Sequence, residues 1–317
     1  MPERTVLPTV VKSPVAVVCH DAGAAHLVFA WLRHWCETGL LAGHSFRLVL
    51  QGPALKAWQY QPVTFPEVQV HTTLNDALVG CQCVLTGTGW ASELEHQARQ
   101  LAKRLGISSI AVIDHWVNYA ERFERDKVVV LPDHIWVSDH YAEGLAKDLF
   151  KNTPVLTLPN LYLYNLVKKI PPVPKDCRNL LYVLEPVRND WGRGVPGEFQ
   201  ALDYFVQNLA QMVGAQPAHI TLRPHPSDPP DKYSEWMQTN SSLDIRLDSQ
   251  MDLNASIAQA RWVVGVDSFA LVVANMAGRE TFSSLPPWAH GCRLPTDVVF
   301  QIYTHKRIDF RQLTRNF

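Results

Sequence analysis

Polar side chains follow five apolar segments of this sequence, at points where strands of a parallel sheet would end. The most suggestive is Asp114, which follows an apolar run and precedes His115, Trp116 and Asn118. A carboxylate at such a strand end can act as a general base or as a nucleophile. The three residues after it can bind sugar hydroxyls or the face of a ring. The alternative is that Asp114 only caps a short helix.

Two more segments place acids beside small residues. Asp21 follows the run Val15–Cys19 and precedes a stretch of Ala and Gly, which lets a backbone approach a ligand at a helix N-terminus. We expect Asp21 to contact an acceptor hydroxyl, with a plain N-cap as the alternative. Glu93 and Glu95 follow the Gly-rich segment 86–89 and lie about 200° apart on a helix, so only one can face a site. We take Glu93 as the site residue; the alternative is an acidic first turn that complements the helix dipole.

The second half of the chain favours an anion. Arg223 offers a planar fork of donors and His225 a further donor, which together suit a phosphate. Ser268, after Asp267, would cap a helix whose free amides point at an anion. A structural histidine and a plain N-cap are the alternatives. Glu185 also ends an apolar run, where it could accept hydrogen bonds from a nucleobase or a ribose.

Short apolar runs alternate with helical patterns along the whole chain, and these elements must position the polar residues. Continuous apolar strands that alternate with helices are typical of parallel sheets covered on both faces, with ligands at the carboxyl ends of the strands. We expect strands at 15–19, 47–50, 68–71, 83–86, 109–113, 134–138, 154–158, 180–184, 219–222, 261–266 and 279–282, and helices at 22–35, 91–105, 141–150, 196–213 and 269–277.

The chain length and a proline-rich break predict two domains. The chain has 317 residues, and the segment 168–175 holds three prolines, which favour an extended linker. We therefore expect an α/β fold of two doubly wound Rossmann-like domains, 1–168 and 169–317, facing each other across a cleft that holds the site.

Composition excludes several classes of protein. Hydrophobic residues make up 47% and charged residues 19%, which excludes a disordered chain. A net charge of −1 gives no electrostatic footprint for nucleic acid. Six scattered cysteines favour reduced thiols. Cys81 and Cys83 lack the CxxC spacing of a zinc site, so no metal is expected.

Nothing in the sequence resembles a targeting or membrane-spanning segment. The N-terminus has no apolar core of a signal peptide, and no window approaches the roughly 18 apolar residues of a membrane helix. We expect a cytoplasmic protein, with contact at the inner face of the membrane left open. The basic tail 304–317 could pack as a final helix, cross back onto the first domain, or touch anionic lipid or glycan.

The ordered motifs Asp114-His115-Trp116, His225-Pro226 and Asp267-Ser268 resemble those of GT-B glycosyltransferases that use CMP-activated acid sugars. These are the bacterial sialyltransferases and, more loosely, the Kdo transferases of capsule and lipopolysaccharide assembly. In place of the second acid and glycine usual in sialyltransferases this chain has His115 and Trp116, which favours Kdo, pseudaminic acid or another octulosonic or nonulosonic acid as the donor sugar. The resemblance implies a GT-B fold, with acceptor binding in 1–168 and nucleotide-sugar binding in 169–317.

The resemblance also implies roles for the polar residues. Asp114 would be the base or the nucleophile, with Glu93 or Asp21 as a second acid. No metal or other cofactor is implied, since a CMP donor carries one phosphate that side chains can meet. The expected partners are the CMP-sugar donor and an oligosaccharide or lipid-linked glycan acceptor. The donor site would comprise Glu185, Arg223, His225, Pro226, Asp267 and Ser268, and the acceptor site His20, His115, Trp116 and Asn118.

Three other readings stay open at this stage. The first is a GT-B enzyme that uses a nucleoside diphosphate (NDP) sugar, either a transferase or a sugar 2-epimerase. The second is a polyol-phosphate transferase, which also uses a cytidine nucleotide. The third is a two-domain protein that binds a glycan or nucleotide without turnover.

Overall fold

The computed structural model describes residues 6–59, 68–214, 218–250, 252–295 and 300–301. The chain forms two compact units, the first ending at Tyr162 and the second beginning at Leu163. This division falls inside helix α6 (Leu161–Val167), just before the expected linker at 168–175, which contains no helix or strand. The acceptor and nucleotide roles expected of the two halves stay predictions.

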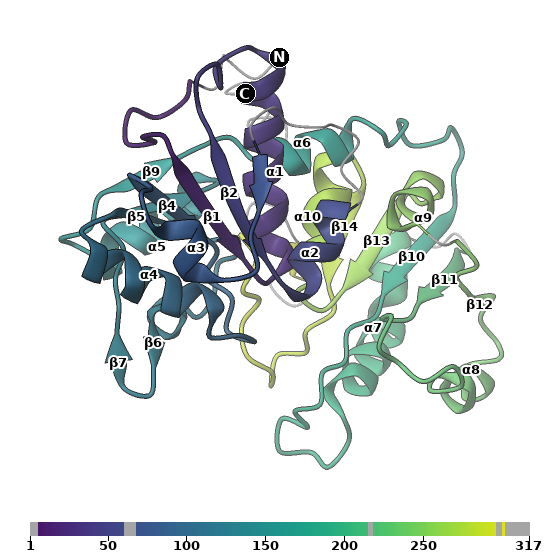
Figure 1. The fold of residues 1–317 in the computed structure, drawn as a ribbon. Coiled ribbons are helices and arrows are strands. Elements are labelled where there is room, and N and C mark those ends of the chain that lie inside the picture. Colours follow the sequence, from purple (N-terminus) through teal and green to yellow (C-terminus); the bar gives the residue numbers. More distant parts are fainter. Residues whose placement is uncertain (1–5, 60–67, 215–217, 251, 296–299, 302–317) are drawn as a thin grey trace. The chain divides into compact units, whose positions relative to one another are not determined.

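The first unit is built on a seven-stranded parallel sheet in the order β3-β2-β1-β4-β5-β8-β9 (Figure 1). The order reverses direction between β1 and β4, which is the switch point where such sheets bind ligands. Its strands are β1 (Val15–Cys19), β2 (Phe46–Leu50), β3 (Val68–Val70), β4 (Cys83–Thr86), β5 (Ser108–Val112), β8 (His134–Val137) and β9 (Val155–Thr157).

Alternate residues of these strands enter the cores on the two faces of the sheet, as the period of two requires. Val15 and Val17 pack with the long helix α1, including its Trp31, while Ala16 and Val18 pack with α3 and α4. The helices are α1 (Ala22–Glu37), α2 (Gly52–Gln59), α3 (Leu74–Leu78), α4 (Leu94–Leu105) and α5 (His140–Leu149), with a 3-10 turn η1 (Glu121–Phe123) and a hairpin of β6 (Glu124–Arg125) and β7 (Val128–Val129).

The second unit repeats the design with a six-stranded parallel sheet in the order β12-β11-β10-β13-β14-β15. Its switch point lies between β10 and β13. Tyr182 and Phe205 belong to the core between the sheet and α7. The elements are β10 (Asn179–Val183), α7 (Gly197–Val213), β11 (His219–Arg223), α8 (Ser234–Thr239), β12 (Ile245–Leu247), α9 (Leu253–Gln259), β13 (Trp262–Gly265), α10 (Phe269–Met276), β14 (Glu280–Ser283) and β15 (Phe300–Gln301).

The two parallel α/β sheets confirm the predicted fold class, and each expected strand and helix is present within a few residues of its predicted bounds. The structure adds short elements that the sequence pattern did not predict, such as α2, α9 and the β6–β7 hairpin. The tail 304–317 lies outside the described residues. In the part of the chain that is described, no helix has the length and apolar character to cross a membrane, and no cluster of three potential metal ligands occurs.

Candidate active site

The switch point of the first sheet brings three strand ends together. β1 leads into His20 and Asp21, and its neighbour β4 leads into the loop 87–89. β5, on the far side of β4, leads into Asp114. Because parallel strands end at the same edge of a sheet, these three segments form one site.

Two carboxylates of this site pack directly against glycines. A Cβ placed on Gly23, in the first turn of α1, would lie 1.7 Å from Asp114 Oδ2. A Cβ on Gly89 would lie 2.1 Å from Asp21 Oδ2. No side chain fits at either position without moving its carboxylate, so the glycines of both motifs serve to admit acids.

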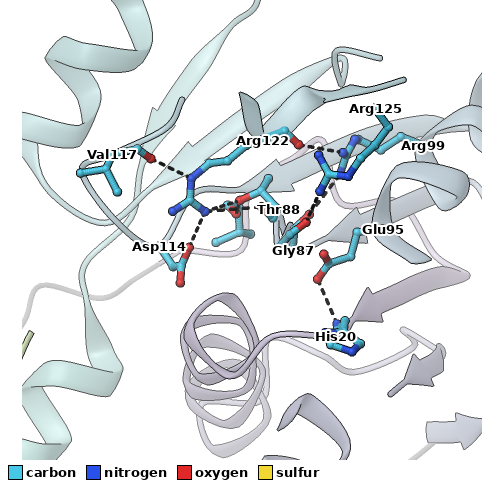
Figure 2. Close-up of polar contacts among 11 residues, drawn as sticks. His20, Gly87, Thr88, Glu95, Arg99, Asp114, Val117, Arg122 and Arg125 are labelled. Carbon is cyan, nitrogen blue, oxygen red and sulfur yellow. Dashed lines mark hydrogen bonds and ion pairs between the residues drawn. The ribbon is translucent and has the colours of Figure 1, made fainter. Parts of the chain in front are cut away.

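Glu95 is the third carboxylate, and unlike the other two it has no exposed surface. Its side chain is buried, and Oε1 accepts a hydrogen bond from the backbone N–H of His20 at 2.9 Å (Figure 2). A Cβ on Gly87 would lie 2.4 Å from the same oxygen. Burial raises the pKa of Glu95 and the charge of Asp21 raises it further, while the His20 hydrogen bond and Arg99 act in the opposite direction.

Three arginines hold the loop 87–89 from the other side (Figure 2). Arg99, buried in α4, donates to the carbonyl of residue 87 at 3.1 Å. Arg125, from the hairpin, donates to the carbonyl of residue 89 at 2.7 Å. Arg122 donates to the hydroxyl of Thr88 at 3.0 Å. Burial lowers the pKa of Arg99 to about 10, so it stays charged at neutral pH.

Asp114 is oriented by an ion pair. Arg122 Nη1 donates to Asp114 Oδ1 at 2.8 Å, and Arg122 Nε donates to the carbonyl of Val117 at 3.0 Å (Figure 2). The side chain of Asp114 keeps 22% of its surface exposed. The site therefore offers an oriented carboxylate that a ligand can reach.

His20 and Asp21 form a second pair. His20 Nδ1 lies 2.7 Å from Asp21 Oδ1. On its other side the ring lies over Gly52, where a Cβ would be 2.6 Å from His20 Nε2. The imidazole is therefore fixed between a carboxylate and a glycine.

Four predicted residues of the first unit remain: Glu93, Trp116, His115 and Asn118. Glu93 is exposed and pairs with Arg125 Nε at 3.2 Å, so Glu95 rather than Glu93 is the acid beside Asp21. Trp116 Nε1 donates to the Asp139 carboxylate at 3.0 Å, which ties the loop after β5 to the start of α5. His115 contacts the ring of Trp116. Asn118 is exposed, with a left-handed φ of 58°.

The switch point of the second sheet carries Glu185 and Asp267. Glu185 Oε2 accepts from the backbone N–H of Asp267 at 2.9 Å. Arg293 clamps the Asp267 carboxylate with two bonds, of 2.6 and 3.1 Å. Burial, and then the charge of Asp267, raise the pKa of Glu185 to about 7. Ser268 caps α10 through the N–H of Ala270 at 3.2 Å.

The predicted phosphate residues have protein partners of their own. Arg223 Nη1 donates to Asp248 Oδ2 at 2.6 Å and to Ser256 Oγ at 3.0 Å, which ties β11 to the segment before α9 and to α9 itself. His225 is exposed, with Nδ1 2.7 Å from Ser227 Oγ, and Pro226 beside it is exposed as well. Whether these residues bind a phosphate stays a prediction.

Sequence reasoning predicted Arg223 but missed the arginines that lie beside the carboxylates of both switch points. Arg99 could have been found, because it lies four residues after Glu95 on one helix face, where two buried charges are expected to compensate each other. Arg122 and Arg293 gave no such signal, since Arg122 lies in the short 3-10 turn η1 and Arg293 in an irregular segment.

No protein-family model matches the chain, and no curated protein matches it in sequence. Solved structures match the chain in fold. The UDP-GlcNAc 2-epimerase of Methanocaldococcus jannaschii is similar at 10% identity and a TM-score of 0.57, covering 85% of this chain and 83% of its own. The Neisseria meningitidis UDP-GlcNAc 2-epimerase bound to UDP-GlcNAc is similar at 11% identity and a TM-score of 0.54, covering 85% of this chain and 81% of its own.

A glycosyltransferase of Rickettsia africae is similar at 9% identity and a TM-score of 0.53, covering 86% of this chain and 79% of its own. At this level of identity the likeness is one of fold. The chain therefore has the GT-B fold, with two Rossmann-like units, as the motifs implied. None of these three descriptions names a CMP sugar.

Proposed function

We propose that this chain is a sugar-transferring enzyme that acts on a nucleoside diphosphate sugar. The observation that carries the proposal is the group of three carboxylates, Asp21, Glu95 and Asp114, at the switch point of the first sheet. Neighbours of the same fold are described as enzymes of UDP-GlcNAc, which supports an NDP-sugar over a CMP-sugar donor.

In the proposed reaction Asp114 is the general base. Its ion pair with Arg122 fixes the direction of the carboxylate. A base so oriented can remove the proton of an acceptor hydroxyl as that oxygen attacks the anomeric carbon. The bond from that carbon to the diphosphate oxygen breaks in the same step, and the nucleoside diphosphate leaves with the electron pair. A general base of this kind is worth roughly 10²–10⁴ in rate. Arg122 itself acts through Asp114 and is a positioning residue.

The donor would bind the second unit. Glu185 can accept hydrogen bonds from ribose hydroxyls, and the exposed His225 can donate to a phosphate. The capped N-terminus of α10, at Ser268, offers backbone amides to the same anion. Arg223 supports this surface through its bonds to Asp248 and Ser256.

The CMP-activated acid sugar is the second candidate, because the ordered motifs at 114–116, 225–226 and 267–268 favour it. A 2-epimerase is the alternative within the NDP-sugar class. It would use the same carboxylates to move a proton at carbon 2 of the sugar rather than to activate an acceptor.

A thermal-shift panel with UDP, GDP, CDP and CMP, each with and without Mg²⁺, tests the donor class. A ligand at 100 times its Kd stabilises the folded chain by about 2.7 kcal/mol, which is a shift of a few degrees. We expect a shift with a nucleoside diphosphate, lost in Glu185→Ala. A shift with CMP alone would move the function to the second candidate, and no shift with any nucleotide would overturn both.

The sugar chemistry is then read by proton NMR of the stabilising nucleotide's sugar conjugates. Transfer needs an added acceptor, whereas epimerisation produces a second nucleotide sugar without one. Asp114→Asn is expected to stop either reaction while keeping the nucleotide shift.

A further inference from the structure

Two carboxylate oxygens, one from Asp21 and one from Glu95, lie close to the backbone of Gly89. The position that its Cβ would occupy lies 2.1 Å from Asp21 Oδ2 and 3.0 Å from Glu95 Oε2. The two carboxyl groups therefore approach each other across a residue that contributes no side chain between them.

The outer oxygens of the two groups are held by one residue. His20 donates its backbone N–H to Glu95 Oε1 at 2.9 Å, and its ring Nδ1 lies 2.7 Å from Asp21 Oδ1. The inner oxygens are left to face Gly89. Glu95 Oε2 is buried and makes no hydrogen bond to a side chain among the described residues, although the backbone N–H of Gly89 is close enough to lower the pKa of Glu95.

Two basic side chains lie near the pair: the His20 ring contacts Asp21, and the charge of Arg99 lowers the pKa of Glu95. The Arg99 guanidinium donates to the Thr86 hydroxyl and to the carbonyl of Gly87, and no ion pair joins it to Glu95 in the described part of the chain. Asp114 adds negative charge close by: burial first, and then the charges of Glu95, Asp114 and Asp21, raise the pKa of the Cys19 thiol.

The inner oxygens of Asp21 and Glu95 both lie within about 3.0 Å of one point, and Glu95 is buried. Ionising both groups would place two like charges close together, one of them away from water, which costs free energy. We propose that Asp21 and Glu95 form a carboxyl pair that holds one shared proton, with Glu95 as the buried member and Asp21 as the member that presents the proton to the site. Asp21 keeps 28% of its side chain exposed, so a ligand can reach it.

The pair gives the site an acid to complement its base. With one proton bound it carries one negative charge, and it can lose that proton from Asp21 and regain it from solvent. The role as proton donor in sugar chemistry rests on the proposed function, whereas the sharing of a proton does not. Glu95 acts through Asp21 and is a positioning residue.

Carbon-13 NMR of the side-chain carboxyls in the full chain tests the sharing directly, without substrate. We expect Glu95 to titrate well above an ordinary glutamate, and its midpoint to fall by at least one pH unit, a tenfold change in proton affinity, in Asp21→Asn. The exposed Glu121→Gln is the matched control and leaves the Glu95 resonance where it was. A Glu95 that titrates in the ordinary range, or that ignores Asp21→Asn, would overturn the proposal.

Activity adds a second readout once a substrate is known. Glu95→Gln, which mimics the protonated acid, is expected to move the alkaline limb of the pH profile while nucleotide binding stays unchanged. If this variant does not fold, the Asp21→Asn titration still decides. If NMR shows the shared proton but no nucleotide stabilises the chain, only the proposed function is refuted. If a nucleotide stabilises the chain but NMR shows no shared proton, only the carboxyl pair is refuted.

Discussion

Asp114 is held from two sides: Arg122 Nη1 donates to its Oδ1 at 2.8 Å, and its Oδ2 lies against the backbone of Gly23. The arginine comes from the turn after β5 and the glycine from the first turn of α1, so two strand ends fix one carboxylate. A base that is oriented before substrate arrives loses little freedom in the reaction, which is how such groups gain rate.

Replacing Asp114 by Asn should separate chemistry from binding. The amide keeps the size of the side chain but cannot accept a proton, so we expect turnover to fall by roughly 100-fold or more. Nucleotide-induced stabilisation should be unchanged, because we expect the nucleotide to bind the second unit. Initial rates and thermal shifts of the same preparation give both quantities. A variant that retained full turnover would remove Asp114 from the reaction.

Gly23→Ala should disturb the same carboxylate without touching its charge. The new Cβ would lie 1.7 Å from Asp114 Oδ2, so the side chain must move and turnover should fall. Gly144→Ala in α5 is the control, since a Cβ there meets nothing within 4 Å. It should stabilise the chain by about 0.5–1 kcal/mol through helix propensity alone. Equal effects of both substitutions on rate and melting temperature would contradict this account.

The fold could be predicted because its strands are short apolar runs whose ends are marked by polar residues. Val15–Cys19 is an example: it is buried at every position, as a central parallel strand must be, and the acid two residues later marks its end. Elements such as α9 could not be predicted this way, since a seven-residue helix with mixed polarity has no clear period.

The sequence predicted two of the three carboxylates of the candidate site, Asp21 and Asp114, and chose Glu93 in place of the third, Glu95. Strand ends located Asp21 and Asp114, but helix geometry alone could not choose between Glu93 and Glu95. The choice depends on which face of α4 packs on the sheet, and Glu95 shares the buried face with Arg99. A partner charge four residues away is the feature that distinguishes the buried acid from the exposed one.

His96, on the same helix, should make stability depend on acid pH. It is 3% exposed, and neither ring nitrogen has a hydrogen-bond partner among the described residues. Burial, followed by the charges of Arg99 and Arg125, lowers its pKa below the ordinary 6.5. The folded state therefore binds this proton more weakly than the unfolded state, so the stability that His96 contributes is present above about pH 6.5 and is lost as the pH falls.

Urea unfolding at a series of pH values tests this. His96→Gln keeps buried polar atoms but does not titrate, so it should reduce the acid sensitivity without a gain at neutral pH. His96→Leu removes the unpaired polar atoms as well and should also raise stability at pH 8. The idea fails if both variants lose stability with falling pH as steeply as the parent chain.

Glu185 should have the opposite dependence. Burial and the neighbouring Asp267 raise its pKa from 4.5 to about 7, so the folded state binds this proton more tightly than the unfolded state. Its contribution to stability is complete below about pH 4.5 and is lost as the pH rises through about 7. Glu185→Gln cannot ionise and should flatten the stability curve across that window, whereas Glu235→Gln, at an exposed position in α8, should follow the parent. A Glu185→Gln curve that also follows the parent would mean that Glu185 is ionised throughout.

The titration of Glu185 should also govern nucleotide binding, because only the ionised carboxylate accepts two ribose hydroxyls at full strength. UDP affinity measured by calorimetry should therefore rise between pH 6 and pH 8 in the parent and stay level in the variant.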